Sequence, residues 1–144
     1  PETLRRLVPL ADHVVFSERG LRDFTGIADA RAALQGVAKH VHATLGVTLG
    51  EHGSLWWLDN AFHHLPAPVV DAVDTTGCGD VFHGAYALGL AEGAGVLEAA
   101  RFATAAAALK AANGEGWDGM PKRAAVMALL ARGWDQAQPS SFNA

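Results

Sequence analysis

The sequence has little cysteine, no cluster of positive charge and no long apolar run. Cys78 is the only cysteine among 144 residues, so the chain has no disulfide framework, and a reducing, cytoplasmic location is the expectation. Lysine and arginine number 11 against 15 aspartates and glutamates, which gives a formal net charge of −4. This balance argues against nucleic-acid binding and against binding to an anionic membrane, and no stretch is apolar enough to span a bilayer.

Half of the residues are hydrophobic, which is enough for a packed core. Short apolar or β-branched runs predict strands, and runs with helical spacing predict helices. We expect strands at 13–17, 41–50, 54–59 and 61–67, the last two forming a hairpin around Asp59-Asn60, and helices at 2–8, 29–40, 79–92, 96–112 and 122–133. The alternation predicts an α/β fold with three α/β/α layers and a mostly parallel sheet.

The segment PETLRRLVPLADHVVFS has no initiator methionine and reads as a helix that runs directly into a strand. We therefore expect the sequence to begin inside a larger protein. Residues 113–121 are expected to form a loop, with Pro121 at the first position of the last helix, and residues 136–144 a frayed polar tail.

Residues 71–84, DAVDTTGCGDVFHG, place a glycine-rich turn before a helix. The first N–H groups of a helix lack intrahelical partners, and the helix dipole favours an anion there, so this pattern is typical of a phosphate site. Gly77 and Gly79 would let a phosphate approach the backbone. Asp80 would repel that phosphate unless it accepts a proton from an attacking hydroxyl. The alternative is that Asp80 merely stabilises the helix end and Thr75 or Thr76 is its N-cap.

Two other phosphate-binding patterns are absent. The Walker A loop needs a Gly-Lys pair followed by Ser or Thr, which this sequence does not contain. The dinucleotide fingerprint G-x-G-x-x-G also fails, because the glycine after Gly77 and Gly79 comes too late, at Gly84.

The stretch DTTGCGDVFHGAYALGL resembles the C-terminal signature of the ribokinase-like (PfkB) carbohydrate kinases, D-T-x-G-A-G-D-x-F-x-G-A. VTLGEHG (47–53) resembles the strand and turn beside the nucleotide in that family, and RFATAAAALK (101–110) resembles its alanine-rich helix near the adenine. The order and spacing of these blocks fit from about residue 12 to about residue 130. The resemblance implies a ribokinase-like fold in which residues 1–144 are the C-terminal, nucleotide-binding part of a kinase domain. The N-terminal half, which carries the substrate residues and the lid, would be absent.

The resemblance also implies roles for individual residues. Asp80 would be the general base, and the backbone N–H groups of Gly77, Cys78, Gly79 and Asp80 would form the anion hole for the transferred phosphoryl group. ATP, with Mg²⁺, would contact Thr48, Gly50, Gly53, Thr104 and Ala107. From the residues alone, Thr48 could equally be an ordinary strand residue, and the two glycines turn residues.

Asp74 and Thr76 match positions that help to hold a monovalent cation such as K⁺ in several family members. The alternative is that Asp74 only closes the turn by accepting backbone N–H groups.

Two departures from the family pattern stand out. In SERGLRDFTG, Ser17 and Gly20 replace the Asn and Glu of an N-x-x-E motif that tunes Mg²⁺ binding, and this stretch resembles a subset that includes ketohexokinase and sulfofructose kinase. Cys78 stands where alanine is usual. A thiol at a helix N-terminus tends to have a lowered pKa and could be redox-sensitive; the alternative is a small residue that fills a small space.

The resemblance implies ATP-dependent phosphorylation of a sugar by a full-length parent that is a homodimer. The isolated 144 residues would bind ATP weakly and turn over no sugar, because the substrate pocket would be incomplete. Two alternatives remain: a nucleoside kinase of the same fold, which would share every motif seen here, and a non-catalytic nucleotide-binding fragment.

Overall fold

A computed structural model describes residues 2–114 and 116–134 of the chain, which divides into two compact units. The first unit comprises the chain up to Gly50 together with Ser54–His64. The second comprises Glu51–Gly53 and the chain from Leu65 onward. The expected tail at 136–144 lies outside the described residues.

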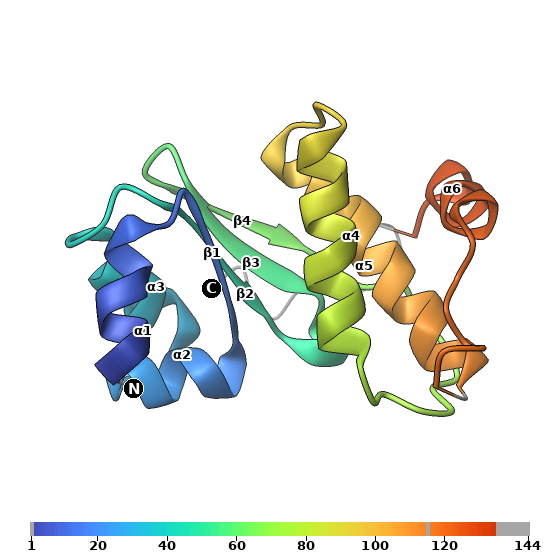
Figure 1. The fold of residues 1–144 in the computed structure, drawn as a ribbon, viewed down its shortest axis with the longest axis horizontal. Helices are drawn as coiled ribbons and strands as arrows, with labels where there is room; N and C mark the ends of the chain where they lie inside the picture. The colour runs from blue at the N-terminus through green and yellow to red at the C-terminus, as the bar shows by residue number, and fades with distance from the viewer. Residues whose placement is uncertain (1, 115, 135–144) are drawn as a thin grey trace. The chain divides into compact units, whose positions relative to one another are not determined.

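The first unit is a four-stranded sheet with helices on one face (Figure 1). Its strands are β1 (His13–Ser17), β2 (Thr44–Thr48), β3 (Ser54–Leu58) and β4 (Ala61–Leu65), in that spatial order. Its helices are α1 (Glu2–Leu7), the 3₁₀ turn η1 (Val8–Leu10), α2 (Glu18–Thr25) and α3 (Ala30–Ala38). A second 3₁₀ turn, η2 (Gly50–His52), follows β2.

The α/β prediction is confirmed, but these four strands form a mixed sheet rather than a mostly parallel one. β1 and β2 are parallel, whereas β2 and β3 are antiparallel. The connection between β2 and β3 is too short for the crossover that parallel pairing requires. The predicted hairpin between β3 and β4 is confirmed: Asp59 and Asn60 have φ values of 50° and 61°, as a two-residue turn of this kind demands.

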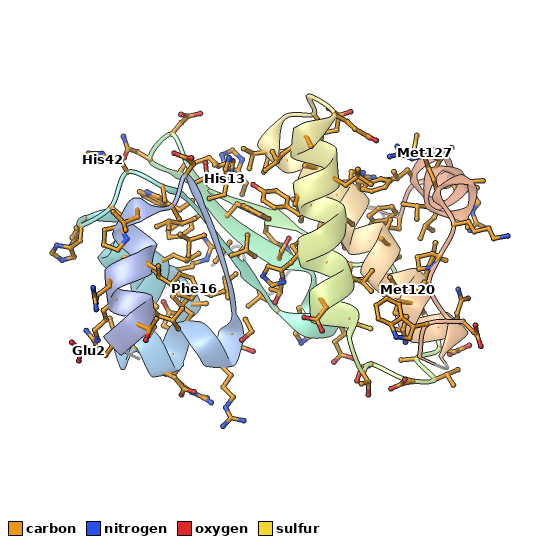
Figure 2. All side chains as sticks on the ribbon, viewed as in Figure 1. Glu2, His13, Phe16, His42, Met120 and Met127 are labelled. Atoms are coloured by element: carbon orange, nitrogen blue, oxygen red, sulfur yellow. The ribbon has the colours of Figure 1, made fainter. Side chains whose placement is uncertain are left out.

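The core of the first unit lies between the sheet and its helices. Phe16 of β1 points to the helical side (Figure 2), where its ring centroid is 5.4 Å from that of Phe24. Leu21 beside them is 1% exposed. These contacts explain α2, which the sequence analysis did not predict: only Leu21 and Phe24 mark its apolar face, and the rest of the helix is polar or glycine.

The second unit is built on three helices, α4 (Cys78–Ala91), α5 (Val96–Asn113) and α6 (Arg123–Arg132). The residues 92–95 that join α4 to α5 are few, so the two helices run antiparallel and side by side (Figure 1). The N-cap of α6 is Lys122, so Pro121 precedes the helix and the expectation that it occupies the first helical position is wrong. None of the described helices is long and apolar enough to be a candidate membrane span.

Small side chains let α4 and α5 approach closely. A Cβ atom added to Gly89 of α4 would lie 2.9 Å from the Cβ atom and 3.1 Å from the Cα atom of Ala99 on α5. Ala99 is itself fully buried. Gly84, also in α4, has no atom within 4 Å of such a Cβ position.

We therefore expect Gly89→Ala and Gly84→Ala to have opposite effects on the free energy of unfolding of the full-length protein, measured by urea denaturation. Both changes improve helix propensity, which contributes about 1 kcal/mol. Only Gly89→Ala forces the helices apart, and overpacking of this kind costs about 1–3 kcal/mol. Equal stabilisation by the two changes would show that the contact between α4 and α5 is looser than described.

Candidate active site

The loop before α4 is fastened to the end of α5. The backbone N–H groups of Val73 and Asp74 both donate to the carbonyl oxygen of Ala111, at 2.8 and 3.2 Å. The Asp74 side chain then closes a tight turn, because its Oδ1 accepts the N–H of Thr76 at 2.9 Å. Gly77 follows in the left-handed conformation, with φ 76°, which a residue with a side chain rarely adopts. The chain thus enters α4 in a fixed direction.

The first turn of α4 presents unpaired backbone donors. The N–H of Cys78 is used internally, by the carbonyl of Thr75 at 3.2 Å. Within the described part of the chain, the N–H groups of Gly77, Gly79 and Asp80 have no protein acceptor. Of the four N–H groups predicted to form an anion hole, three therefore have no acceptor among the described residues, and that of Cys78 has one. The N-cap is Gly77, and no side chain caps the helix, so the alternative in which Thr75 or Thr76 is the N-cap is wrong.

Asp80 is the third residue of α4, and its side chain is exposed. Together with Thr76 and Gly77, it borders a cavity of about 500 Å³.

The rest of the cavity lining is mainly apolar and comes from α4, α5, α6 and the loop between the last two. These residues are Val81, Gly84, Ala85, Leu88, Phe102, Ala106, Lys110, Gly116, Trp117, Met120, Pro121, Arg123 and Val126. Met120, one of these lining residues, is labelled in Figure 2. A mainly apolar wall of this kind favours a flat ring over a hydroxyl-rich sugar.

Lys110, in the last turn of α5, is 2% exposed. Its Nζ donates to the carbonyl oxygen of Gly114 at 3.2 Å and lies 3.7 Å from Oδ2 of Asp74. The N–H and hydroxyl of Thr76, and to a smaller extent the Lys110 ammonium, hold the pKa of the Asp74 carboxyl below its usual value. Lys110 was not predicted as a site residue; its signal in the sequence is that of a single charged residue inside an alanine-rich helix.

Cys78 is half-buried, and its Sγ lies 3.9 Å from the carbonyl oxygen of Asp74. Burial raises the pKa of the thiol, although the nearby Lys110 ammonium acts in the opposite direction. The expected tendency toward a lowered pKa is therefore reversed. This environment favours the alternative reading of Cys78, as a small residue that fills space.

The residues predicted to contact the nucleotide lie in both units. Thr48, at the end of β2, donates its hydroxyl to the carbonyl of Phe16 at 3.5 Å, and Gly50 begins η2; both belong to the first unit. Gly53 belongs to the second unit and is packed against the chain at Leu65 so tightly that a Cβ atom would lie 2.0 Å from that carbonyl oxygen. The close packing alone requires glycine at position 53, which agrees with the alternative that Gly53 is a turn residue.

Thr104 and Ala107 occupy different positions on α5 from the residues that line the cavity. Thr104 is buried, and its hydroxyl donates to the carbonyl of Ala100 at 2.8 Å. The α5 residues that do line the cavity are Phe102, Ala106 and Lys110, spaced four apart along one stripe of the helix.

The departure from the N-x-x-E motif also has a local explanation. Ser17 is the N-cap of α2, and its Oγ accepts the N–H of Gly20 at 3.0 Å. The two residues that replace the motif thus serve the start of a helix. Within residues 2–114 and 116–134, no three His, Cys, Asp or Glu side chains are grouped so that they could hold a metal ion.

Comparison with known proteins gives consistent results. The family model described as pfkB family carbohydrate kinase matches residues 1–123. Ribokinase from Lactococcus lactis is 37% identical over 98 residues, which are 68% of this chain and 33% of that protein.

Two solved structures extend the likeness to the fold. Fructokinase from Vibrio cholerae, solved with fructose, ADP and a calcium ion, has a TM-score of 0.82 and 32% identity and covers 90% of this chain and 44% of its own. A double mutant of that fructokinase was solved with potassium. Ribokinase from Arabidopsis thaliana, complexed with ribose and ATP, has a TM-score of 0.76 and 33% identity and covers 86% of this chain and 42% of its own.

The chain spans about a third of the length of the curated relatives it matches. Over that span the agreement is close, because the family model covers most of the chain and the solved structures share its fold with more than 30% identity. The chain therefore has the ribokinase-like α/β fold and belongs to the pfkB family of carbohydrate kinases.

Proposed function

We propose that this chain is the nucleotide-binding part of an ATP-dependent kinase that phosphorylates a hydroxyl group of a sugar. The observation that carries the proposal is the start of α4, where Asp80 stands in the first turn and the backbone N–H groups of Gly77, Gly79 and Asp80 have no acceptor among the described residues. Donors of this kind bind a phosphoryl group, and a carboxylate next to them is positioned to receive a proton.

In the proposed reaction, the sugar hydroxyl attacks the γ-phosphorus of ATP, and Asp80 takes the hydroxyl proton. The bond from the γ-phosphorus to the bridging oxygen breaks, and ADP leaves with the bonding electrons. The N–H groups of Gly77, Gly79 and Asp80 meet the charge on the equatorial oxygens of the transferred group. Mg²⁺ carried by the nucleotide supplies further neutralisation of the phosphates.

The relatives support a sugar as the acceptor. Ribose and fructose occur in the two solved structures described above, each with a nucleotide. Because the chain spans about a third of its curated relatives, we propose that the sugar pocket and the lid come from residues outside this sequence and that the 144 residues alone turn over no sugar. We also propose that the full-length protein is a homodimer.

The adenine ring has two candidate positions on α5. The family resemblance places it near Thr104 and Ala107, with Thr48, Gly50 and Gly53 completing the nucleotide site. The cavity lined by Phe102 and Ala106 offers an apolar wall on a different stripe of the helix. We propose the first position, because the family resemblance assigns the contact with the adenine to Thr104 and Ala107.

Replacement of Asp80 tests the proposed base. We expect Asp80→Asn in the full-length protein to lower kcat by about 10²–10⁴-fold, because the amide cannot accept the proton, with little change in KM for ATP. The measurement is ADP release with a panel of ketoses, aldoses and nucleosides, which also identifies the substrate class.

Glu98→Gln is the matched control, because Glu98 is likewise exposed and is the third residue of its helix, α5. Its activity should equal that of the wild type. If Asp80→Asn retained full turnover, Asp80 would not be the base. If the wild-type protein bound ATP and released no ADP with any acceptor, the non-catalytic alternative would hold.

A pair of leucine substitutions distinguishes the two adenine positions. We expect Ala107→Leu to weaken binding of a fluorescent ATP analogue by at least about tenfold, because a larger side chain prevents the close approach of a flat ring. Ala106→Leu should leave the affinity unchanged, since its side chain would project into the cavity. The reverse result would place the adenine in the cavity and exclude the position that we propose.

A further inference from the structure

We propose that the ammonium group of Lys110 takes the place of the bound monovalent cation in this kinase, so that the protein needs no K⁺. The inference rests on the proposed kinase function for its catalytic meaning, but its structural basis is independent. Lys110 is 2% exposed, and its Nζ lies between the carbonyl oxygen of Gly114 and Oδ2 of Asp74, at 3.2 and 3.7 Å.

Three sources of negative potential surround this point. The first is the Asp74 carboxylate, and the second is the carbonyl dipole of Gly114. The third is the C-terminus of α5, since this helix ends at Asn113 and its dipole favours a cation there. A compact ammonium with three N–H donors is well matched to an oxygen-lined site of this kind.

The same residues do not fit an additional K⁺ ion. Asp74 was predicted to be a ligand together with Thr76, but its Oδ1 accepts the N–H of Thr76, and its Oδ2 already faces the Lys110 ammonium at 3.7 Å. A K⁺ ion at this point would also lie beside the Lys110 charge.

A permanent cation here would serve the anion hole. Lys110 pairs with Asp74, and Asp74 shapes the turn that leads through Thr76 and Gly77 into α4. Its charge also acts on Cys78, the first residue of α4: burial raises the pKa of this thiol, and the Lys110 ammonium opposes that rise. Lys110 is thus a positioning residue that offsets the Asp74 carboxylate close to the proposed phosphate site.

The test compares melting temperatures of the full-length protein in potassium chloride and in tetramethylammonium chloride at equal ionic strength. For the wild type we expect equal values in the two salts. Lys110→Met removes the charge and retains a linear side chain. We expect this variant to melt lower than the wild type in tetramethylammonium and to gain roughly 2–4 °C in potassium, as K⁺ enters the vacated position.

Lys39→Met is the matched control, because Lys39 is exposed at the end of α3. The melting temperature of Lys39→Met should be the same in the two salts. The inference would be overturned by a wild type that potassium stabilises, or by a Lys110→Met protein whose melting temperature is the same in both salts. If Lys110→Met does not fold, the melting temperatures of the wild type in the two salts still test the inference.

Turnover of the wild type in the same two salts separates this inference from the kinase proposal. Equal kcat values in the two salts support both. Absence of turnover in either salt, on every acceptor, would contradict the kinase proposal while the melting temperatures still decide the role of Lys110. A kcat that rises in potassium would contradict the inference and leave the kinase proposal standing.

Discussion

The candidate site depends on the attachment of one loop to the end of one helix. The last carbonyl groups of a helix lack intrahelical partners, and the loop before α4 contains backbone N–H groups that also need partners. Here the helix end and the loop supply partners to one another, because the Ala111 carbonyl accepts the N–H groups of both Val73 and Asp74. The left-handed Gly77 then turns the chain into α4. The direction of the free N–H groups of α4 is therefore set by the end of α5.

This attachment also creates an electrostatic problem. Asp74 closes the turn with its carboxylate, and the Thr76 donors that hold its pKa low also keep it negative at neutral pH. A fixed negative charge so near a phosphate site would weaken phosphate binding. The buried Lys110 ammonium, 3.7 Å from Oδ2 of Asp74, offsets that charge. The turn can therefore use a carboxylate for its geometry without presenting an uncompensated anion to the ligand.

The sequence predicted the parts of the molecule that depend on local patterns. Asp59-Asn60 specifies a two-residue turn by itself, and the DTTGCGD stretch specifies a turn and a helix start through its glycines, so both were located correctly. The exposed helix α2 was missed because its start depends on the Ser17 side chain and its apolar face on only Leu21 and Phe24. The sheet was predicted to be mostly parallel, although the predicted strands at 41–50 and 54–59 left a connection too short for a parallel crossover, and β3 is indeed antiparallel to β2. Lys110 was not predicted as a site residue, because its partners, Asp74 and Gly114, meet only when the loop folds back on α5.

The antiparallel pairing of α4 and α5 connects these observations. Two antiparallel neighbours place the positive end of one helix dipole beside the negative end of the other. At this end of the pair, the first turn of α4 offers N–H donors to an anion, and the last turn of α5 offers carbonyl groups to a cation. Gly89 and Ala99 permit the close approach of the two helices, so the small side chains of the alanine-rich stretch contribute to the electrostatics of the site as well as to its packing. Lys110 supplies the cation from within the chain, and a phosphate on α4 would supply the anion. Each of the two charges then stabilises the helix end that it faces and attracts the other.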